Sequence, residues 1–261
     1  MKEFFGFGGY TRPAEGYLSW QHLLFVTSLV VVMTILAIVL GRRNRCRTQK
    51  EKNRVLIAAA LLIDGLELLK ILVLCLRDGG GHPILHNLPL FLCSIQLITI
   101  PLAAFSRGRV KEASLDFVCI FGLLGALLGT YAAGNNYGTY PVLSMDNVVS
   151  GITHCISGFS ALYIFISGMV SMKKENIVIT FSILLAFCLL AYTANRVLDY
   201  NYMFLMAGDG TPYDILYNLV AGHPVLYPLG VVALFLIYIT GFYGIYHLTA
   251  RKKSPTEASV G

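Results

Sequence analysis

Seven long apolar stretches alternate with polar connections along the chain. A helix that crosses the hydrocarbon core of a bilayer needs about 20 consecutive apolar residues. The stretches that approach or exceed this length cover residues 20–41, 55–76, 88–105, 112–133, 147–171, 176–198 and 223–249. The pattern therefore predicts an all-α, polytopic membrane protein in which residues 20–249 form a single domain of seven transmembrane helices.

The Lys and Arg residues lie mainly in alternate connections. Fifteen of the 20 fall on one predicted side of the membrane, in residues 42–54, 106–111, 172–175 and 250–261. The other side holds Lys2, Arg12 and Arg77. Positively charged loops stay in the cytoplasm. The distribution predicts an extracytoplasmic segment at 1–19, a cytoplasmic tail at 250–261 and a multi-pass location in the cell membrane.

Composition supports a membrane protein and excludes some partners. The chain is 56% hydrophobic and 13% charged, whereas a soluble domain carries about 25% charged residues. The net charge of +6 does not indicate nucleic acid, because the basic residues flank the spans, and it favours contact with anionic lipid head groups. Six scattered cysteines include no CxxC pair and no Cys–His spacing of a zinc site. We expect no disulfide, metal or soluble cofactor.

Polar side chains inside the spans gather towards the predicted outer side. They are Asp64, Glu67, Lys70, Cys93, Gln96, His154, Asn195, Arg196 and Asp199, with His86 and His223 at the outer mouths of two spans. Such residues are costly at membrane depth and are usually functional. At 1.5 Å per residue, Cys93 lies about 8 Å and His154 about 10 Å below the outer ends of their helices. One outward-opening, water-containing cavity would satisfy these groups together.

Cys93 and His154 are the candidates for chemistry in this cavity. A cysteine nucleophile needs a nearby base to generate its thiolate, and His154 is the histidine placed well inside a span on that side. The alternatives stay open, since a cysteine in an apolar helix commonly packs as a small hydrophobe and a buried histidine is often structural. Glu67 and Lys70, spaced i, i+3, can hold the bundle as an ion pair or bind substrate.

Two other features bear on the cavity. Residues 199–222 are too polar to span and predict either a lid over the cavity mouth or a long external loop. Within this region Asn201 and Tyr202 join Arg196 and Asp199, a predicted ion pair, as candidate substrate-binding residues. Gly125 and Gly129 form a GxxxG pattern that favours close packing inside the bundle over dimerisation.

Three motifs resemble those of the bacterial YwaF-type integral membrane family. They are LPLFLC at 88–93, ITHCISG around His154 and NYMFL at 201–205. That family is remotely similar to the eukaryotic transmembrane protein 164 family, whose members are described as glycerophospholipid acyltransferases with a cysteine at the start of span three. The resemblance implies that Cys93 is the nucleophile and His154 its base. Many relatives carry His where this chain has Phe91.

Two functions follow from these observations. The first is a lipid acyltransferase, in which Cys93 attacks an acyl ester, His154 moves the proton, and Gln96 or Asn195 stabilises the oxyanion. The alternative is a transporter or binder of a small polar or lipid ligand that uses the charged residues in the membrane. Membrane lipids are the expected partners. The acyl donor, the acceptor and the oligomeric state stay open.

Overall fold

The structure, a computed structural model, describes residues 2–78, 85 and 87–253, and the regular secondary structure of these residues is entirely helical. This confirms the all-α prediction. The chain divides into two compact units, Met1–Val170 and Ser171–Gly261. The single transmembrane domain at 20–249 stays a prediction.

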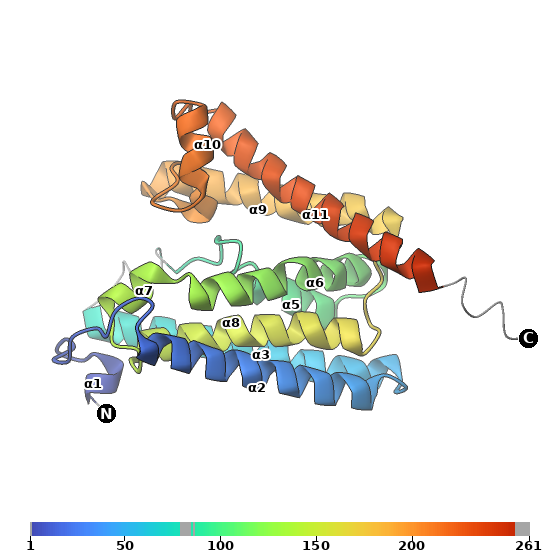
Figure 1. Cartoon of the computed structure of the whole chain (residues 1–261), viewed down its shortest axis with the longest axis horizontal. Coiled ribbons are helices and arrows are strands. Elements are labelled where there is room, and N and C mark those ends of the chain that lie inside the picture. Colours follow the sequence, from blue (N-terminus) through green and yellow to red (C-terminus); the bar gives the residue numbers. More distant parts are fainter. Residues whose placement is uncertain (1, 79–84, 86, 254–261) are drawn as a thin grey trace, which may run out of the picture. The chain divides into compact units, whose positions relative to one another are not determined.

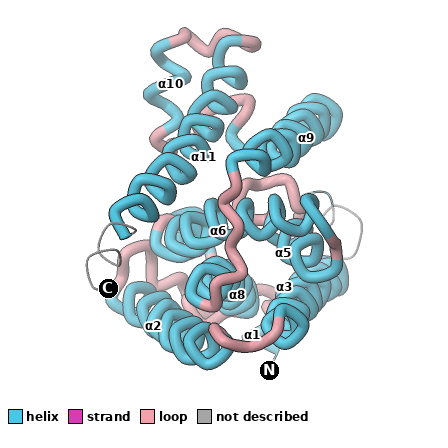
Figure 2. The backbone as a smooth tube through the Cα atoms, turned by 90° about the vertical axis from the view of Figure 1, so that its right-hand side faces the viewer, coloured by secondary structure: helices cyan, strands magenta, loops and turns pink. Residues whose placement is uncertain are grey.

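The first unit is a bundle built around one central helix. It contains α1 (Lys2–Phe5), α2 (Trp20–Asn44), α3 (Gln49–Asp78), α5 (Gln96–Phe105), α6 (Gly108–Tyr131), α7 (Gly134–Thr139) and α8 (Met145–Ile166). Helices α2, α3, α5 and α6 all pack against α8, as the end-on view in Figure 2 shows. The buried face of α8 is rich in small residues such as Gly151, Gly158 and Ala161, which let neighbouring helices approach closely.

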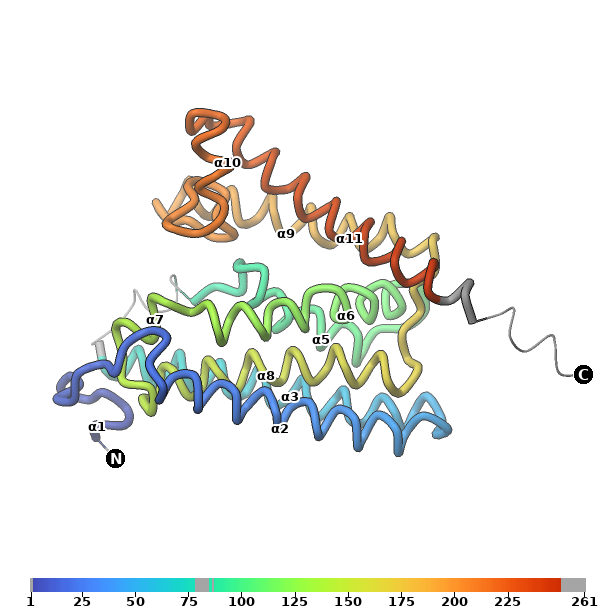
Figure 3. The backbone as a smooth tube through the Cα atoms, viewed as in Figure 1, coloured from blue at the N-terminus to red at the C-terminus, as the bar shows by residue number. Residues whose placement is uncertain are grey.

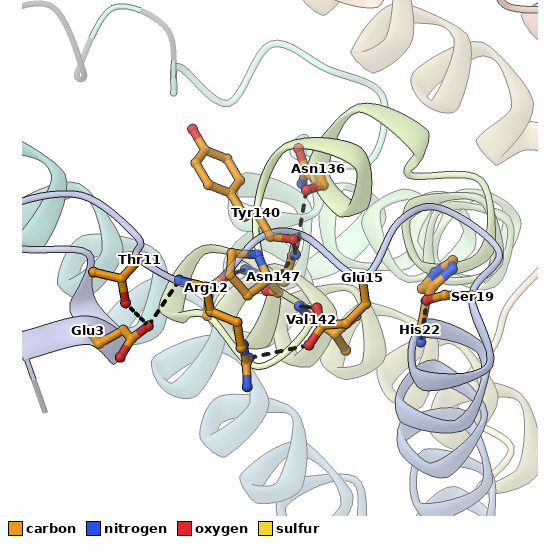
Figure 4. A network of polar contacts seen from close by, with 12 residues as sticks. Glu3, Thr11, Arg12, Glu15, Ser19, His22, Asn136, Tyr140, Val142 and Asn147 are labelled. Atoms are coloured by element: carbon orange, nitrogen blue, oxygen red, sulfur yellow. Dashed lines mark hydrogen bonds and ion pairs between the residues drawn. The ribbon is translucent and has the colours of Figure 1, made fainter.

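The N-terminal segment is tied to one end of this bundle rather than being a free tail (Figure 4). The carboxylate of Glu15 accepts a hydrogen bond of 2.7 Å from the backbone N–H of Val142 and forms an ion pair with Arg12. Glu3 accepts hydrogen bonds from the hydroxyl of Thr11 and the backbone N–H of Arg12. Hydrogen bonds therefore hold the segment before α2 against the end of the bundle.

A largely buried ion pair lies at the same end of the bundle. Arg77 of α3 donates two hydrogen bonds, of 2.8 and 3.1 Å, to the carboxylate of Asp146 in the first turn of α8. The hydroxyl of Tyr10 donates to the same carboxylate. Burial, followed by the negative charge and hydrogen bond of Asp146, raises the pKa of Tyr10 to about 12, so the hydroxyl stays protonated near neutral pH. This cluster joins the N-terminal segment to α3 and α8.

The second unit contains two long helices and a folded connection between them. Its elements are η1 (Lys174–Asn176), α9 (Ile177–Leu198), η2 (Tyr202–Phe204), α10 (Tyr213–Leu219) and α11 (Leu226–Lys253). Helices α9 and α11 pack together (Figure 3), and the hydroxyls of Thr180 and Tyr243 lie 3.2 Å apart between them. The connection, predicted as a lid or loop, contains both η2 and α10, and its position over the cavity stays a prediction.

Five of the seven predicted spans correspond to helices that are long and apolar enough to cross a membrane. Among the described residues these are α2, α6 continued by α7, α8, α9 with η1, and α11 (Figure 1). Helix α3 is 30 residues long, but its apolar part carries Asp64, Glu67 and Lys70. Helix α5 is apolar but has only 10 residues. The structure therefore describes a helical protein with five candidate membrane-spanning helices.

The third predicted span, 88–105, is wrong as one continuous helix. Residues 91–95 form turns, and the helix begins only at Gln96. The backbone bonds from Gln96 to Cys93, from Leu97 to Ser94 and from Ile98 to Ile95 join residues three apart, as in a 3₁₀ helix. Pro89 contributes to this irregular start, because it lacks a backbone N–H and disfavours helical geometry in the preceding residue.

The basic connection 42–54 is also shorter than predicted. Helix α2 runs on to Asn44, and α3 already begins at Gln49. Thr48 and Glu51 explain the early start: the backbone N–H of Glu51 donates to the Thr48 hydroxyl at 3.3 Å, and the Thr48 N–H donates to the Glu51 carboxylate at 3.0 Å. This reciprocal capping box satisfies two N–H groups that would otherwise lack partners.

Candidate functional site

Cys93 lies in the irregular stretch that leads into α5. Its side chain lies near Ser94 and His154, and Cys93 and His154 line the same small pocket. Non-helical backbone is tolerated at membrane depth only where protein or a polar cavity surrounds it. The turn at 91–95 therefore presents the thiol of Cys93 to α8, instead of leaving it against lipid.

His154 is oriented by its own helix. The Nδ1 atom of His154 lies 2.7 Å from the carbonyl oxygen of Ser150, one turn earlier in α8. A carbonyl oxygen only accepts hydrogen bonds, so this contact places the ring proton on Nδ1. The lone pair of a neutral imidazole is then on Nε2. Thiol, imidazole and carbonyl thus have the order that a nucleophile, a base and an orienting group have in cysteine enzymes.

The ion pair predicted between Glu67 and Lys70 faces the same pocket. The Lys70 Nζ lies 2.5 Å from the Glu67 carboxylate, and both side chains are largely buried. The pocket has a volume of about 50 Å³ and is lined by Ile63, Glu67, Lys70, Cys93, Ser94, Leu97, Ser150, Thr153 and His154. This volume holds a few water molecules, so in this conformation it admits a reacting group but not an entire lipid head group.

Two glycines of α6 leave space for the side chains of Cys93 and His154. A Cβ atom added at Gly129 would overlap the imidazole of His154, and one added at Gly125 would lie 3.4 Å from the Cβ of Cys93. The GxxxG pattern therefore packs inside the bundle, as predicted, and its neighbours are the two candidate catalytic side chains.

Gln96, predicted as an oxyanion donor, lies close to Cys93 in sequence but outside the lining of the pocket. It is fully buried. Its Oε1 accepts a hydrogen bond of 3.0 Å from the hydroxyl of Thr99, and its Nε2 has no hydrogen-bond partner among the described residues. An unsatisfied buried amide donor is costly. The Nε2 of Gln96 is therefore a donor still available for a hydrogen bond, one helical turn after Cys93.

The remaining candidate residues belong to the second unit, where most of them organise the chain after α9. The buried side chain of Asn195 donates to the carbonyl of Tyr202 at 3.0 Å and accepts from its N–H at 2.6 Å. Asn201 donates to the carbonyl of Ala207 and accepts from the N–H of Met206. The amide groups of both asparagines are thus engaged within the unit.

Arg196 and Asp199 do not form the predicted ion pair. Both side chains are exposed, and no salt bridge joins them in the part of the chain that the structure describes. Asp199 ends α9 with a left-handed backbone (φ 51°), which turns the chain away from the helix direction.

Other polar residues named from the sequence lie away from the pocket lining. Asp64 is half-buried and has no ion-pair partner among the described residues. His223 is exposed and accepts backbone hydrogen bonds at the start of α11, whereas His86 lies outside the described residues. In the described ranges no group of three His, Cys, Asp or Glu side chains is arranged to hold a metal ion.

Sequence reasoning missed one buried histidine. His22 of α2 is fully buried, accepts from the N–H of Leu18, and has its Nε2 3.1 Å from the carbonyl of Thr130. Both ring nitrogens are engaged, so His22 is a structural residue. The Ser150 carbonyl was also missed, although its spacing of four residues from His154 on one helix was a usable signal.

Comparison with curated proteins gives no match, and neither does comparison with solved structures. A family model does match. It covers residues 17–246, which include the bundle from α2 onwards, the Cys93–His154 pocket and most of the second unit. Together with the apolar helices, this match makes the chain a multi-pass membrane protein that belongs to the TMEM164 family.

Proposed function

We propose that this protein is a membrane acyltransferase that uses Cys93 as nucleophile and His154 as base on a lipid ester. The observation that carries the proposal is that Cys93 and His154 line the same pocket, where the Nδ1 atom of His154 contacts the Ser150 carbonyl at 2.7 Å. Family membership and the implied resemblance to glycerophospholipid acyltransferases support it. The assignment to the bacterial YwaF-type branch remains a prediction from the motifs.

The chemistry would proceed in two balanced steps. His154 takes the thiol proton as the sulfur of Cys93 attacks the ester carbonyl, and the alcohol leaves with that proton, so that the acyl group is held as a thioester. The acceptor hydroxyl then attacks the thioester, His154 takes its proton, and the thiol is regenerated. Gln96 is the proposed oxyanion donor, because its Nε2 has no hydrogen-bond partner among the described residues, and its side chain would have to turn into the pocket during the reaction. No metal or soluble cofactor is required.

The Glu67–Lys70 pair, which lines the same pocket, would contact the polar part of the lipid near the ester. Arg196, Asp199, Asn201 and Tyr202 remain proposed contacts of the second unit with substrate. The alternative function, a transporter or binder of a small polar or lipid ligand, would rely on Glu67 and Lys70 and would not need the thiol.

Lipid mass spectrometry on a deletion strain distinguishes the acyltransferase from the transporter or binder. Complementation with the wild type should restore a lipid species that Cys93→Ala does not restore, because removal of the nucleophile removes the acyl intermediate. Cys155→Ala is the matched control, since Cys155 follows His154 in α8 but does not line the pocket. Full restoration by Cys93→Ala, together with failure of Glu67→Gln at equal protein level, would support the binder or transporter.

We further propose seven spans in the cell membrane, with the N-terminus outside and the C-terminus in the cytoplasm. In this arrangement α3 and the segment 88–105, which ends in α5, cross as part of the bundle, with the charged side chains of α3 facing protein. The basic connections at 42–54, 106–111 and 172–175 support this orientation. Cys46 is exposed in the first of them.

Labelling of intact cells tests the orientation. A membrane-permeant maleimide should label Cys46, and an impermeant one should label it only after lysis, with a Cys46→Ser variant as the control. Rapid labelling of Cys46 by the impermeant reagent in sealed cells would reverse the orientation.

A further inference from the structure

A second, larger cavity lies in the first unit, apart from the Cys93 pocket. Helices α2, α3 and α8 enclose a groove of about 330 Å³, lined by Leu29, Val32, Met33, Leu36, Leu40, Val55, Ala58, Ala59, Leu62, Ile152, Cys155, Ile156 and Phe159. This lining is apolar throughout. At 1.5 Å per residue, the α2 part of the groove, from Leu29 to Leu40, is about 17 Å long.

Unpaired positive charge lies at one end of the groove. Leu40 is followed within one turn by Arg42 and Arg43, and Val55 is directly preceded by Arg54. Between Leu40 and Val55, the exposed cationic side chains with no ion pair among the described residues are Arg42, Arg43, Arg45, Lys50 and Arg54. The neighbouring Arg47 is instead paired with Glu51. The groove thus runs from an apolar interior to a cationic rim.

We propose that this groove binds an anionic phospholipid, with one acyl chain between α2 and α3 and the head group on Arg42 and Arg43 in the last turn of α2 and on Arg54 near the start of α3. The length and apolar lining fit a lipid chain, which is the apolar molecule present at this depth of a bilayer. The charges select the head group, because basic clusters at the end of a transmembrane helix attract anionic lipids. The proposal is independent of the acyltransferase site, which lies at Cys93.

Native mass spectrometry of the purified full-length protein tests the site. The protein is incubated in detergent with phosphatidylglycerol and phosphatidylcholine of identical acyl chains. Wild type should retain one phosphatidylglycerol in preference to phosphatidylcholine. Arg43→Gln combined with Arg54→Gln should lower retention about 30-fold, since each basic side chain near a membrane surface contributes about fivefold.

Two further variants distinguish binding in the groove from non-specific attraction of the lipid to positive charge. Ala58→Trp fills the groove from an exposed position and should lower the retention of phosphatidylglycerol at unchanged charge. Arg107→Gln with Lys174→Gln removes two exposed charges elsewhere and should leave retention within twofold of wild type. Equal retention of both lipids, an unaffected Ala58→Trp variant, or an equal loss in the control pair would each overturn the proposal.

Discussion

Gly129→Ala is expected to lower the proposed acyltransferase activity at least about 100-fold, because loss of a positioned general base costs a factor of about 100 or more. The added methyl group would overlap the imidazole of His154, so the ring has to leave its place beside Cys93. Overpacking of this kind also costs about 1–3 kcal/mol of stability. The lipid species restored in the deletion strain and thermal unfolding in detergent measure the two effects separately.

Two other glycines provide graded controls for this prediction. A Cβ at Gly65 of α3 would meet no atom within 4 Å, and one at Gly125 would lie 3.4 Å from the Cβ of Cys93. Gly65→Ala should therefore retain wild-type activity, and Gly125→Ala should have an intermediate effect. If a stably folded Gly129→Ala protein were as active as Gly65→Ala, the position of His154 would be irrelevant to the chemistry.

Asp146→Ala is expected to destabilise the first unit by about 3 kcal/mol, at the lower end of the cost of leaving a buried charge without its partner. The side chains of Arg77 and Asp146 are only 12% and 11% exposed, so water compensates little for the loss. Tyr10 also loses its acceptor, and the N-terminal segment should loosen. Thermal unfolding and tryptic cleavage after Arg12 measure these two consequences.

The matched control is an exposed ion pair in the same unit. Arg47 and Glu51 are 57% and 40% exposed and lie 3.7 Å apart. Arg47→Ala should change stability by less than about 1 kcal/mol, as is typical of surface pairs. The double variant Arg77→Ala/Asp146→Ala should be less destabilised than the sum of the single changes, because neither charge is left alone. Equal losses of stability in Asp146→Ala and Arg47→Ala would show that burial of the Arg77–Asp146 pair does not increase its contribution to stability.

Much of the helical framework was predictable from apolar length alone. Five predicted spans coincide with helices to within a few residues, because lipid requires a fixed length of apolar helix. The exception at 88–105 shows the limit of this reasoning. Hydropathy records only how apolar a segment is, and it does not distinguish a continuous helix from turns that are covered by neighbouring helices.

The candidate site was predictable in its residue types and only partly in its contacts. Spacing along α3 was sufficient for the Glu67–Lys70 pair, because residues three apart on a helix are neighbours. The proximity of Cys93 and His154 depends on how separate helices pack, and so does the ion pair between Arg77 and Asp146. Spacing along the sequence does not predict either contact. Asn195 shows the opposite error: its polarity indicated a ligand, but its partner is the backbone of Tyr202.

The short length of α5 has a consequence for how the protein is made. A helix of 10 residues is about 15 Å long, half the thickness of the hydrocarbon core. The turns before it leave backbone groups that lipid cannot satisfy. This part of the chain is therefore not a stable membrane segment by itself and depends on α3, α6 and α8 for its place. Under the proposed mechanism, Cys93 therefore gains His154 as its base only when the bundle has assembled.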